Sequence, residues 1–193
     1  MTWRLFLAVA VPEATRRRLA EWARGHAGKG WRPVGERQIH LTLRFLGETP
    51  ATRAEAILHA VERAVAAAEP FAVPIRGWGV FPGPSRARIL WAGVDDRDGR
   101  LARLAAAVEA AVVAAGFPPE TRPFRAHLTL ARAGRGVGRP ALPGRPNGTE
   151  PVFGSLPVSE VALMRSHLLP EGARYERVGA AGLGAAGEER AER

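Results

Sequence analysis

The tetrad His-Leu-Thr-Leu occurs twice in this chain of 193 residues, once in each half. Both copies lie in runs rich in apolar and β-branched residues, with no Gly or Pro inside the tetrad, so both are predicted to be strands. Side chains alternate along a strand, so the leucines point into a core while the histidine and threonine share the other face. Their Cα atoms lie roughly 7 Å apart on that face. The copies are His40-Leu41-Thr42-Leu43 and His127-Leu128-Thr129-Leu130.

One imidazole and one hydroxyl on a shared face are suited to phosphoester chemistry. Histidine can give or take a proton near neutrality, and a threonine hydroxyl can donate a hydrogen bond to a phosphoryl oxygen. Two such faces brought together would supply an acid, a base and two oxygen-binding donors around one phosphorus. A single tetrad is better explained as a solvated strand face. An exact repeat of four residues is rare at ordinary composition and favours function.

The remaining sequence alternates predicted strands and helices, which gives the class α+β. Because a helix precedes each tetrad, the order suggests an internal duplication. Residues 134–151 are rich in Gly, Pro and Arg and are predicted to form a long basic loop, whose Arg135, Arg139 and Arg145 could reach an RNA backbone or be merely solvated. We expect one domain over residues 1–178 and a disordered tail over 179–193. Helices are predicted over 12–26, 52–69 and 101–115, and further strands over 4–11, 71–80, 87–94, 158–167 and 175–178.

Composition narrows the classes of function. The formal net charge is +9, carried by 27 arginines and the single lysine Lys29. This charge favours a polyanionic partner such as nucleic acid, although a GC-rich genome would enrich arginine equally well. The chain has no cysteine, which excludes disulfides, thiolate nucleophiles and cysteine metal ligands. No run approaches the length of a membrane span, so we expect a cytoplasmic protein.

The paired tetrads resemble the His-x-Thr-x motifs of the two-histidine phosphoesterases. Within that superfamily, the chain is similar to the bacterial and archaeal RNA 2',3'-cyclic phosphodiesterases, once called 2'-5' RNA ligases. The resemblance covers about residues 3–178. Outside the tetrads it rests on Arg4-Leu5-Phe6-Leu7-Ala8-Val9, Leu46-Gly47-Glu48, Arg122-Pro123-Phe124, Ala131-Arg132, Arg165-Ser166 and Tyr175.

The resemblance implies a fold and a reaction. The fold has two lobes related by a pseudo-two-fold axis, with two antiparallel-rich sheets facing a central cleft and helices outside. The reaction opens the cyclic phosphate at an RNA end to a 2'-phosphomonoester, with His40 as proton donor and His127 as proton acceptor. The spacing alone does not say which histidine is the acid. Thr42 and Thr129 would hold the non-bridging oxygens, and Arg132 would make a further phosphate or base contact.

The same resemblance implies the partners. We expect a monomer that acts on RNA with a 2',3'-cyclic phosphate end, such as tRNA fragments, away from membranes. With an RNA 5'-hydroxyl in place of water, the reverse reaction would form a 2'-5' linkage. We expect neither metal nor ATP to be needed. Catalytic metal sites need clustered ligands, but neither tetrad contains Asp or Glu, and Lys29 lies in no P-loop.

Three alternatives stay open at this level. A related enzyme could act on a small cyclic nucleotide or on ADP-ribose cyclic phosphate. The chain could be a non-catalytic RNA-binding module, although binding alone would not need two proton carriers. A metallophosphodiesterase is the third alternative. The acidic run from Asp95 to Asp98 could suggest a metal site, but it fits the start of a helix better.

Overall fold

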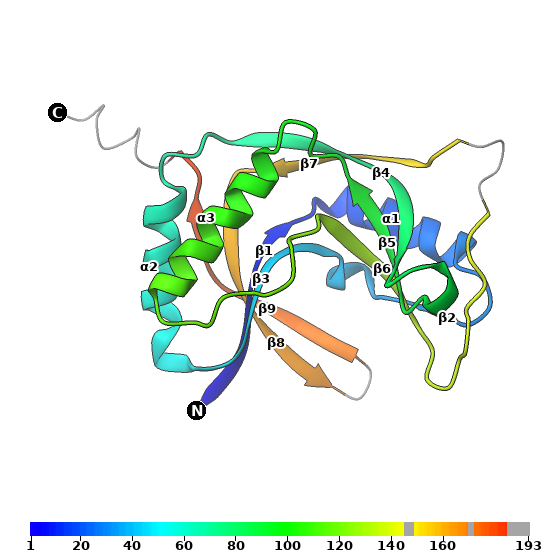
Figure 1. Cartoon of the computed structure of the whole chain (residues 1–193), viewed down its shortest axis with the longest axis horizontal. Coiled ribbons are helices and arrows are strands. Elements are labelled where there is room, and N and C mark those ends of the chain that lie inside the picture. Colours follow the sequence, from blue (N-terminus) through cyan, green and yellow to red (C-terminus); the bar gives the residue numbers. More distant parts are fainter. Residues whose placement is uncertain (145–148, 170–171, 185–193) are drawn as a thin grey trace.

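The computed structural model describes residues 1–144, 149–169 and 172–184. Figure 1 shows the arrangement of its strands and helices. The α+β class predicted from the sequence is confirmed. In chain order the elements are β1 (Thr2–Ala10), α1 (Glu13–His26), β2 (Trp31–Pro33), η1 (Glu36–Gln38), β3 (His40–Pro50), η2 (Ala51–Arg53), α2 (Ala54–Val65), β4 (Phe71–Phe81), η3 (Pro84–Arg86), β5 (Ile89–Val94), α3 (Arg100–Ala114), β6 (His127–Ala133), β7 (Val152–Val158), β8 (Glu160–Leu169) and β9 (Gly172–Gly182).

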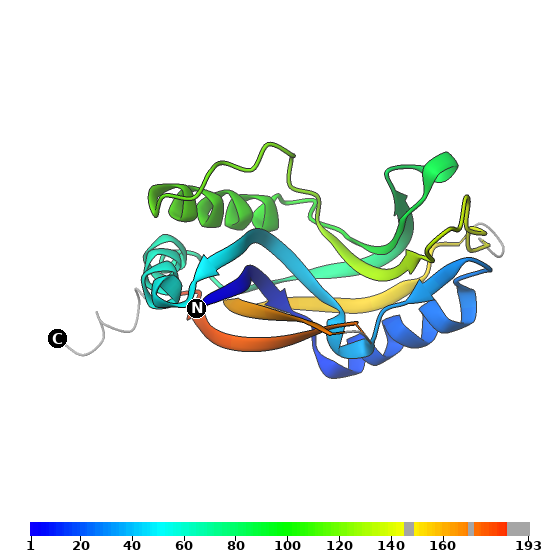
Figure 2. The ribbon, with the colours of Figure 1, turned by 90° about the horizontal axis from the view of Figure 1, so that it is seen from below.

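The two tetrad strands lie side by side at the centre of one antiparallel sheet. The strand order is β7-β4-β5-β6-β3-β1-β8-β9, and β2 pairs with β6 beside it. The expected two sheets are thus joined into one, and the junction between β3 and β6 is the single pair Leu41 and Leu128. The sheet curls strongly along its length (Figure 2). Leu41 and Leu43 of β3 and Leu128 and Leu130 of β6 are buried, so the two halves share a core beneath this junction.

The internal duplication predicted from the order of elements is visible in the spacing. Glu13 begins α1 27 residues before His40, and Arg100 begins α3 the same 27 residues before His127. The helices lie at opposite ends of the molecule, with α2 and α3 packed together at one end and α1 at the other (Figures 1 and 2). The carboxylate of Asp96 accepts hydrogen bonds from the backbone N–H groups of Leu101 and Ala102 in the first turn of α3, so this acidic residue stabilises the start of a helix.

Two short strands were missed by the sequence analysis. The strand β7 contains Gly154 and Pro157, residues that usually interrupt a strand. Among the described strands it forms the sheet edge beside β4, where a missing proline N–H is tolerated. The strand β2 has three residues, too few for a periodic pattern.

The expected tail also begins later than residue 179. The strand β9 continues to Gly182, and Ala181 and Leu183 are buried against the core. Small residues hid this strand, because Gly and Ala carry little strand preference. Residues 185–193 lie outside the described part of the chain. Among the described residues, none of the helices combines the length and the apolar character needed to span a bilayer.

Candidate active site

The two tetrads have the alternating pattern that the sequence predicts. Leu41 and Leu128 are fully buried, whereas the histidine and threonine on either side of each are half-buried on the opposite face. Because Leu41 pairs with Leu128, the histidine and threonine that flank each of these leucines lie on neighbouring strands beside this one pair. The structure therefore brings both predicted histidines and both predicted threonines to one place.

Each imidazole is held through the same ring nitrogen. His40 Nδ1 lies 2.8 Å from the carbonyl oxygen of Gln38, and His127 Nδ1 lies 2.7 Å from the carbonyl oxygen of Arg125. A carbonyl only accepts, so each Nδ1 carries the hydrogen and donates it. In the neutral ring Nε2 is then unprotonated and available to a ligand. In both repeats the carbonyl partner lies two residues before the histidine, so the two rings are held in the same way.

Each imidazole also packs edge to face against one aromatic ring. The His40 and Tyr175 ring centroids are 4.9 Å apart at an angle of 88°, and those of His127 and Phe81 are 5.0 Å apart at 87°. The ring of Phe6 also packs on His40, with the two ring centroids 4.8 Å apart. The sequence analysis assigned none of these rings to the site. Tyr175 carried a signal in its resemblance to the family, but Phe81 stood beside an apparent Pro-Gly turn.

Arg132 reaches the site because of a β-bulge in β6. Simple alternation would place Arg132 on the buried face with Leu130. Instead, the register with β5 shifts by one residue, so Leu130 and Ala131 are both buried and Arg132 returns to the face of Thr129. Arg32 of β2 lies directly opposite Arg132, and two like charges in such a pair repel each other. An anionic ligand would relieve that repulsion.

The comparison with protein families agrees with this geometry. The model of the LigT-like phosphoesterases matches residues 9–91 and 93–175, and each matched segment contains one tetrad. The chain belongs to this family. The division into two matched segments supports the internal duplication seen in the spacing of helices and tetrads.

Relatives of this LigT-like chain are similar over most of their length. A Thermus thermophilus protein named RNA 2',3'-cyclic phosphodiesterase is 37% identical over 181 residues, covering 89% of this chain and 86% of the relative. An Archaeoglobus fulgidus protein of the same name is 33% identical and covers 90% and 96%. A crystal structure from Thermus thermophilus superposes with a TM-score of 0.76 at 34% identity, covering 94% of this chain and 98% of that chain. Escherichia coli LigT complexed with 3'-AMP superposes with a TM-score of 0.74 at 28% identity, covering 95% and 99%.

The electrostatics of this LigT-like site disfavour protonated histidines in the free protein. The pKa of His40 is lowered to about 4, mainly because the ring is buried; the hydrogen bond to the Gln38 carbonyl opposes this shift, and repulsion by Arg132 and His127 adds to it. Burial also lowers the pKa of His127, again assisted by Arg132. Both rings are thus neutral in the free protein near pH 7. A bound anion would raise both pKa values, because a nearby negative charge favours the protonated ring.

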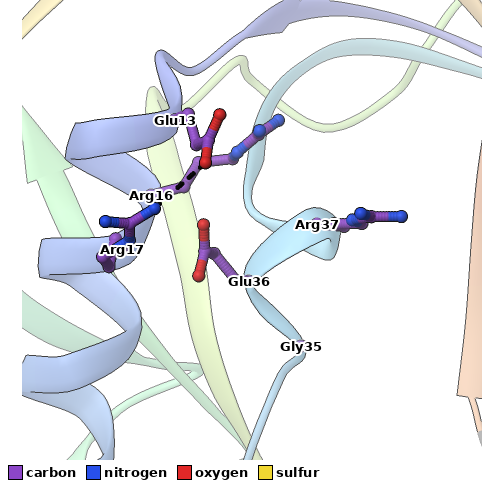
Figure 3. Close-up of a pocket in the computed structure, with 6 residues that line it drawn as sticks. All are labelled: Glu13, Arg16, Arg17, Gly35, Glu36 and Arg37. Atoms are coloured by element: carbon purple, nitrogen blue, oxygen red, sulfur yellow. Dashed lines mark hydrogen bonds and ion pairs between the residues drawn. The ribbon is translucent and has the colours of Figure 1, made fainter.

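Within the described ranges, no group of three or more His, Asp or Glu side chains is arranged to hold a metal ion. A pocket of about 520 Å³ lies between α1 and η1, and the histidines do not line it (Figure 3). Its side chains are mixed in charge, and Arg17 is already paired with Glu13 at 3.0 Å.

Proposed function

We propose that this chain hydrolyses 2',3'-cyclic phosphate ends of RNA and leaves a 2'-phosphomonoester. The observation that carries the proposal is the symmetric pair of His and Thr residues, with both Nε2 atoms available on one face. The relatives named RNA 2',3'-cyclic phosphodiesterase support the substrate class. We expect the enzyme to act as a monomer in the cytoplasm, on RNA ends such as those of tRNA fragments.

In the proposed mechanism, His127 and His40 exchange protons with opposite sides of the phosphorus. His127 Nε2 takes a proton from water as the water oxygen forms its bond to phosphorus. The bond from phosphorus to the 3'-oxygen breaks, and His40 Nε2–H donates its proton to that oxygen. Protons then return to their starting positions through solvent. The orientation of each ring by a carbonyl on Nδ1 keeps Nε2 as the reacting atom in both steps.

The threonines and Arg132 would bind the charged oxygens. Within the described part of the chain, the hydroxyls of Thr42 and Thr129 have no hydrogen-bond partner in the protein. They are free to donate to the two non-bridging oxygens, whose negative charge grows in the transition state. The positive charge of Arg132 lowers the pKa values of both histidines, which supports a role for this residue near them. We propose that it contacts the phosphate.

The lowered histidine pKa values predict different pH optima for the free enzyme and the complex. The profile of kcat/KM reports the free enzyme, in which both pKa values lie below 6.5, so its maximum should fall below pH 6.5. The profile of kcat reports the complex, in which the phosphate raises both pKa values, so its maximum should lie at higher pH. Initial rates across pH would measure both. A kcat/KM optimum at or above the kcat optimum would contradict this account.

A second candidate substrate is a small nucleotide rather than an RNA chain. Escherichia coli LigT has been crystallised with 3'-AMP, with ATP and with NADP+, each a mononucleotide or dinucleotide. Turnover of a cyclic mononucleotide and of a short oligonucleotide with the same end would separate the two candidates. The longer substrate should have the higher kcat/KM if RNA is the substrate.

The basic loop after β6 gives this comparison a structural test. Arg88 holds the loop, since its guanidinium donates to the carbonyl oxygens of Val137 at 3.0 Å and Gly138 at 2.8 Å. The side chains of Arg135 and Arg139 are exposed on it, and Arg145 lies outside the described residues. The double variant Arg135→Ala with Arg139→Ala should bind RNA more weakly. The slope of log Kd against the logarithm of salt concentration should fall by about one to two. Cleavage of a cyclic mononucleotide should stay unchanged.

A charge-matched control separates contact from net charge. Arg63→Ala with Arg103→Ala removes two exposed arginines from α2 and α3, at the other end of the molecule (Figure 1). This control should leave the salt dependence as it is. If both pairs change it equally, the loop arginines are only solvated charge.

The central experiment uses an RNA that ends in a 2',3'-cyclic phosphate. The protein is treated exhaustively with EDTA, and the product is identified as the 2'- or the 3'-phosphomonoester. We expect the 2'-phosphate, formed at an undiminished rate after chelation. Activity lost on chelation and restored by one added metal would favour a metallophosphodiesterase. Joining of a 5'-hydroxyl RNA without nucleotide would support the reverse 2'-5' ligation, whose energy would come from the cyclic phosphate.

A further inference from the structure

The side chain and the backbone of Gln38 together connect three segments around His40. The Gln38 carbonyl accepts the hydrogen bond from His40 Nδ1 at 2.8 Å. Its side-chain Oε1 accepts from the N–H of Gly35 at 2.8 Å, which closes the η1 turn. Its Nε2 donates to the carbonyl oxygen of Ala173 at 2.5 Å, 135 residues away in β9. We propose that Gln38 is a positioning residue that fixes the His40 imidazole for proton transfer.

The link to β9 matters because that strand carries the ring that packs on His40. Ala173 precedes Tyr175 by two residues, and the Tyr175 ring meets the His40 ring edge to face at 4.9 Å. Gln38 therefore fixes β9, which carries the Tyr175 ring, relative to the carbonyl that binds His40 Nδ1. The approach is close, since a Cβ at Gly172 would lie 3.2 Å from Gln38 Nε2 at a backbone φ of +133°. Glycine at this position allows the strand to come within hydrogen-bonding distance.

The η1 turn contacts α1 on one side and β9 on the other. It borders the pocket of about 520 Å³, into which Glu36 projects and from which Arg37 points away (Figure 3). The turn has only three residues, none of them buried. The two side-chain hydrogen bonds of Gln38 tie the turn to Gly35 and to Ala173 of β9, and the Gln38 carbonyl is the partner of His40 Nδ1.

The second repeat contains the same arrangement with different chemistry. Arg125 precedes His127 by two residues, and its carbonyl accepts from His127 Nδ1 at 2.7 Å. Its guanidinium lies 5.8 Å from the centroid of Phe81, the ring that packs on His127. In both repeats, the residue two positions before the histidine contacts the segment that carries the aromatic partner. The repetition argues that this position serves the histidine rather than the local turn alone.

The test compares Gln38→Met with Arg37→Met. Both variants place methionine on the same turn, but only the first removes the hydrogen bonds to Gly35 and Ala173. Misplacement of a reacting group by about 1 Å can cost about a hundredfold in rate, so we expect kcat to fall about tenfold to a hundredfold in Gln38→Met, with KM nearly unchanged. Arg37→Met should match the unsubstituted protein. If Gln38→Met fails to fold, Gln38→Glu keeps the side-chain length and the acceptor for Gly35, and it should show the same loss of kcat.

Nuclear magnetic resonance of the ring nitrogens supplies a reading independent of turnover. In the unsubstituted protein His40 should show the tautomer with hydrogen on Nδ1. Gln38→Met should mix the two tautomers and shift the His40 pKa, because burial of the ring and its hydrogen bond to the Gln38 carbonyl both act on that pKa. An unchanged tautomer and pKa, with or without lost activity, would overturn the positioning role. The inference rests on the proposed two-histidine mechanism only for kcat. Absence of cyclic phosphate turnover in the unsubstituted protein would instead count against the proposed function.

Discussion

Replacing either His40 or His127 with alanine is expected to lower kcat for cyclic phosphate opening by about 10²- to 10⁴-fold, the range that general acid–base catalysis contributes. Each imidazole presents one Nε2 atom to the site, and each is held by a carbonyl on its Nδ1. Without His40 the 3'-oxygen would leave without a proton. Without His127 the attacking water would keep its proton until late in the step.

The double variant should be little slower than either single variant, because residues that act as a unit are strongly non-additive. Single-turnover rates on a cyclic-phosphate RNA would measure this, with binding followed separately. His59→Ala is a suitable control, because His59 is an exposed histidine of α2 whose partners are the helix neighbours Glu55 and Glu62. Near-normal rates in either site variant would refute the two-histidine mechanism.

The predictable part of this site follows from the period of a strand. Alternation alone puts His40 and Thr42 on the face opposite Leu41, and the structure shows that pattern in both repeats. The repeat also predicted the helix before each tetrad. Both inferences depend only on neighbours in sequence, so they needed no knowledge of how the halves meet.

The remaining features depend on contacts between distant segments. The partner of His40 is Tyr175, which lies on β9 and reaches the site only after β1, β8 and β9 have paired. Arg132 faces the threonine because β6 bulges against β5, and a bulge has no signature in the run Leu130-Ala131. The two expected sheets are likewise joined into one through the single residue pair Leu41 and Leu128. Such features are set by the register between strands, and local sequence patterns do not reveal that register.

The threonines offer the most specific test of oxyanion binding. Thr42→Val and Thr129→Val keep the size and branching of the side chain and remove only the hydroxyl. Removal of one preorganised donor costs about 10²- to 10³-fold in kcat, and we expect that loss from each variant. Because the hydroxyl would bind charge that develops in the transition state, kcat and kcat/KM should fall by similar factors. Serine at either position should restore most of the rate.

The same strand provides the control for this loss. Thr49 of β3 is 1% exposed and donates to the carbonyl oxygen of Gly47 at 3.2 Å, away from the histidines. Thr49→Val should lower the unfolding temperature, because a buried hydrogen bond is lost, and leave kcat unchanged. Thr42→Val and Thr129→Val should lower kcat and leave the unfolding temperature unchanged, since neither hydroxyl has a protein partner among the described residues. Equal losses of kcat in all three variants would mean that valine disturbs the strand itself. A rise in KM with constant kcat would mean that the hydroxyls bind the ground state and the transition state equally.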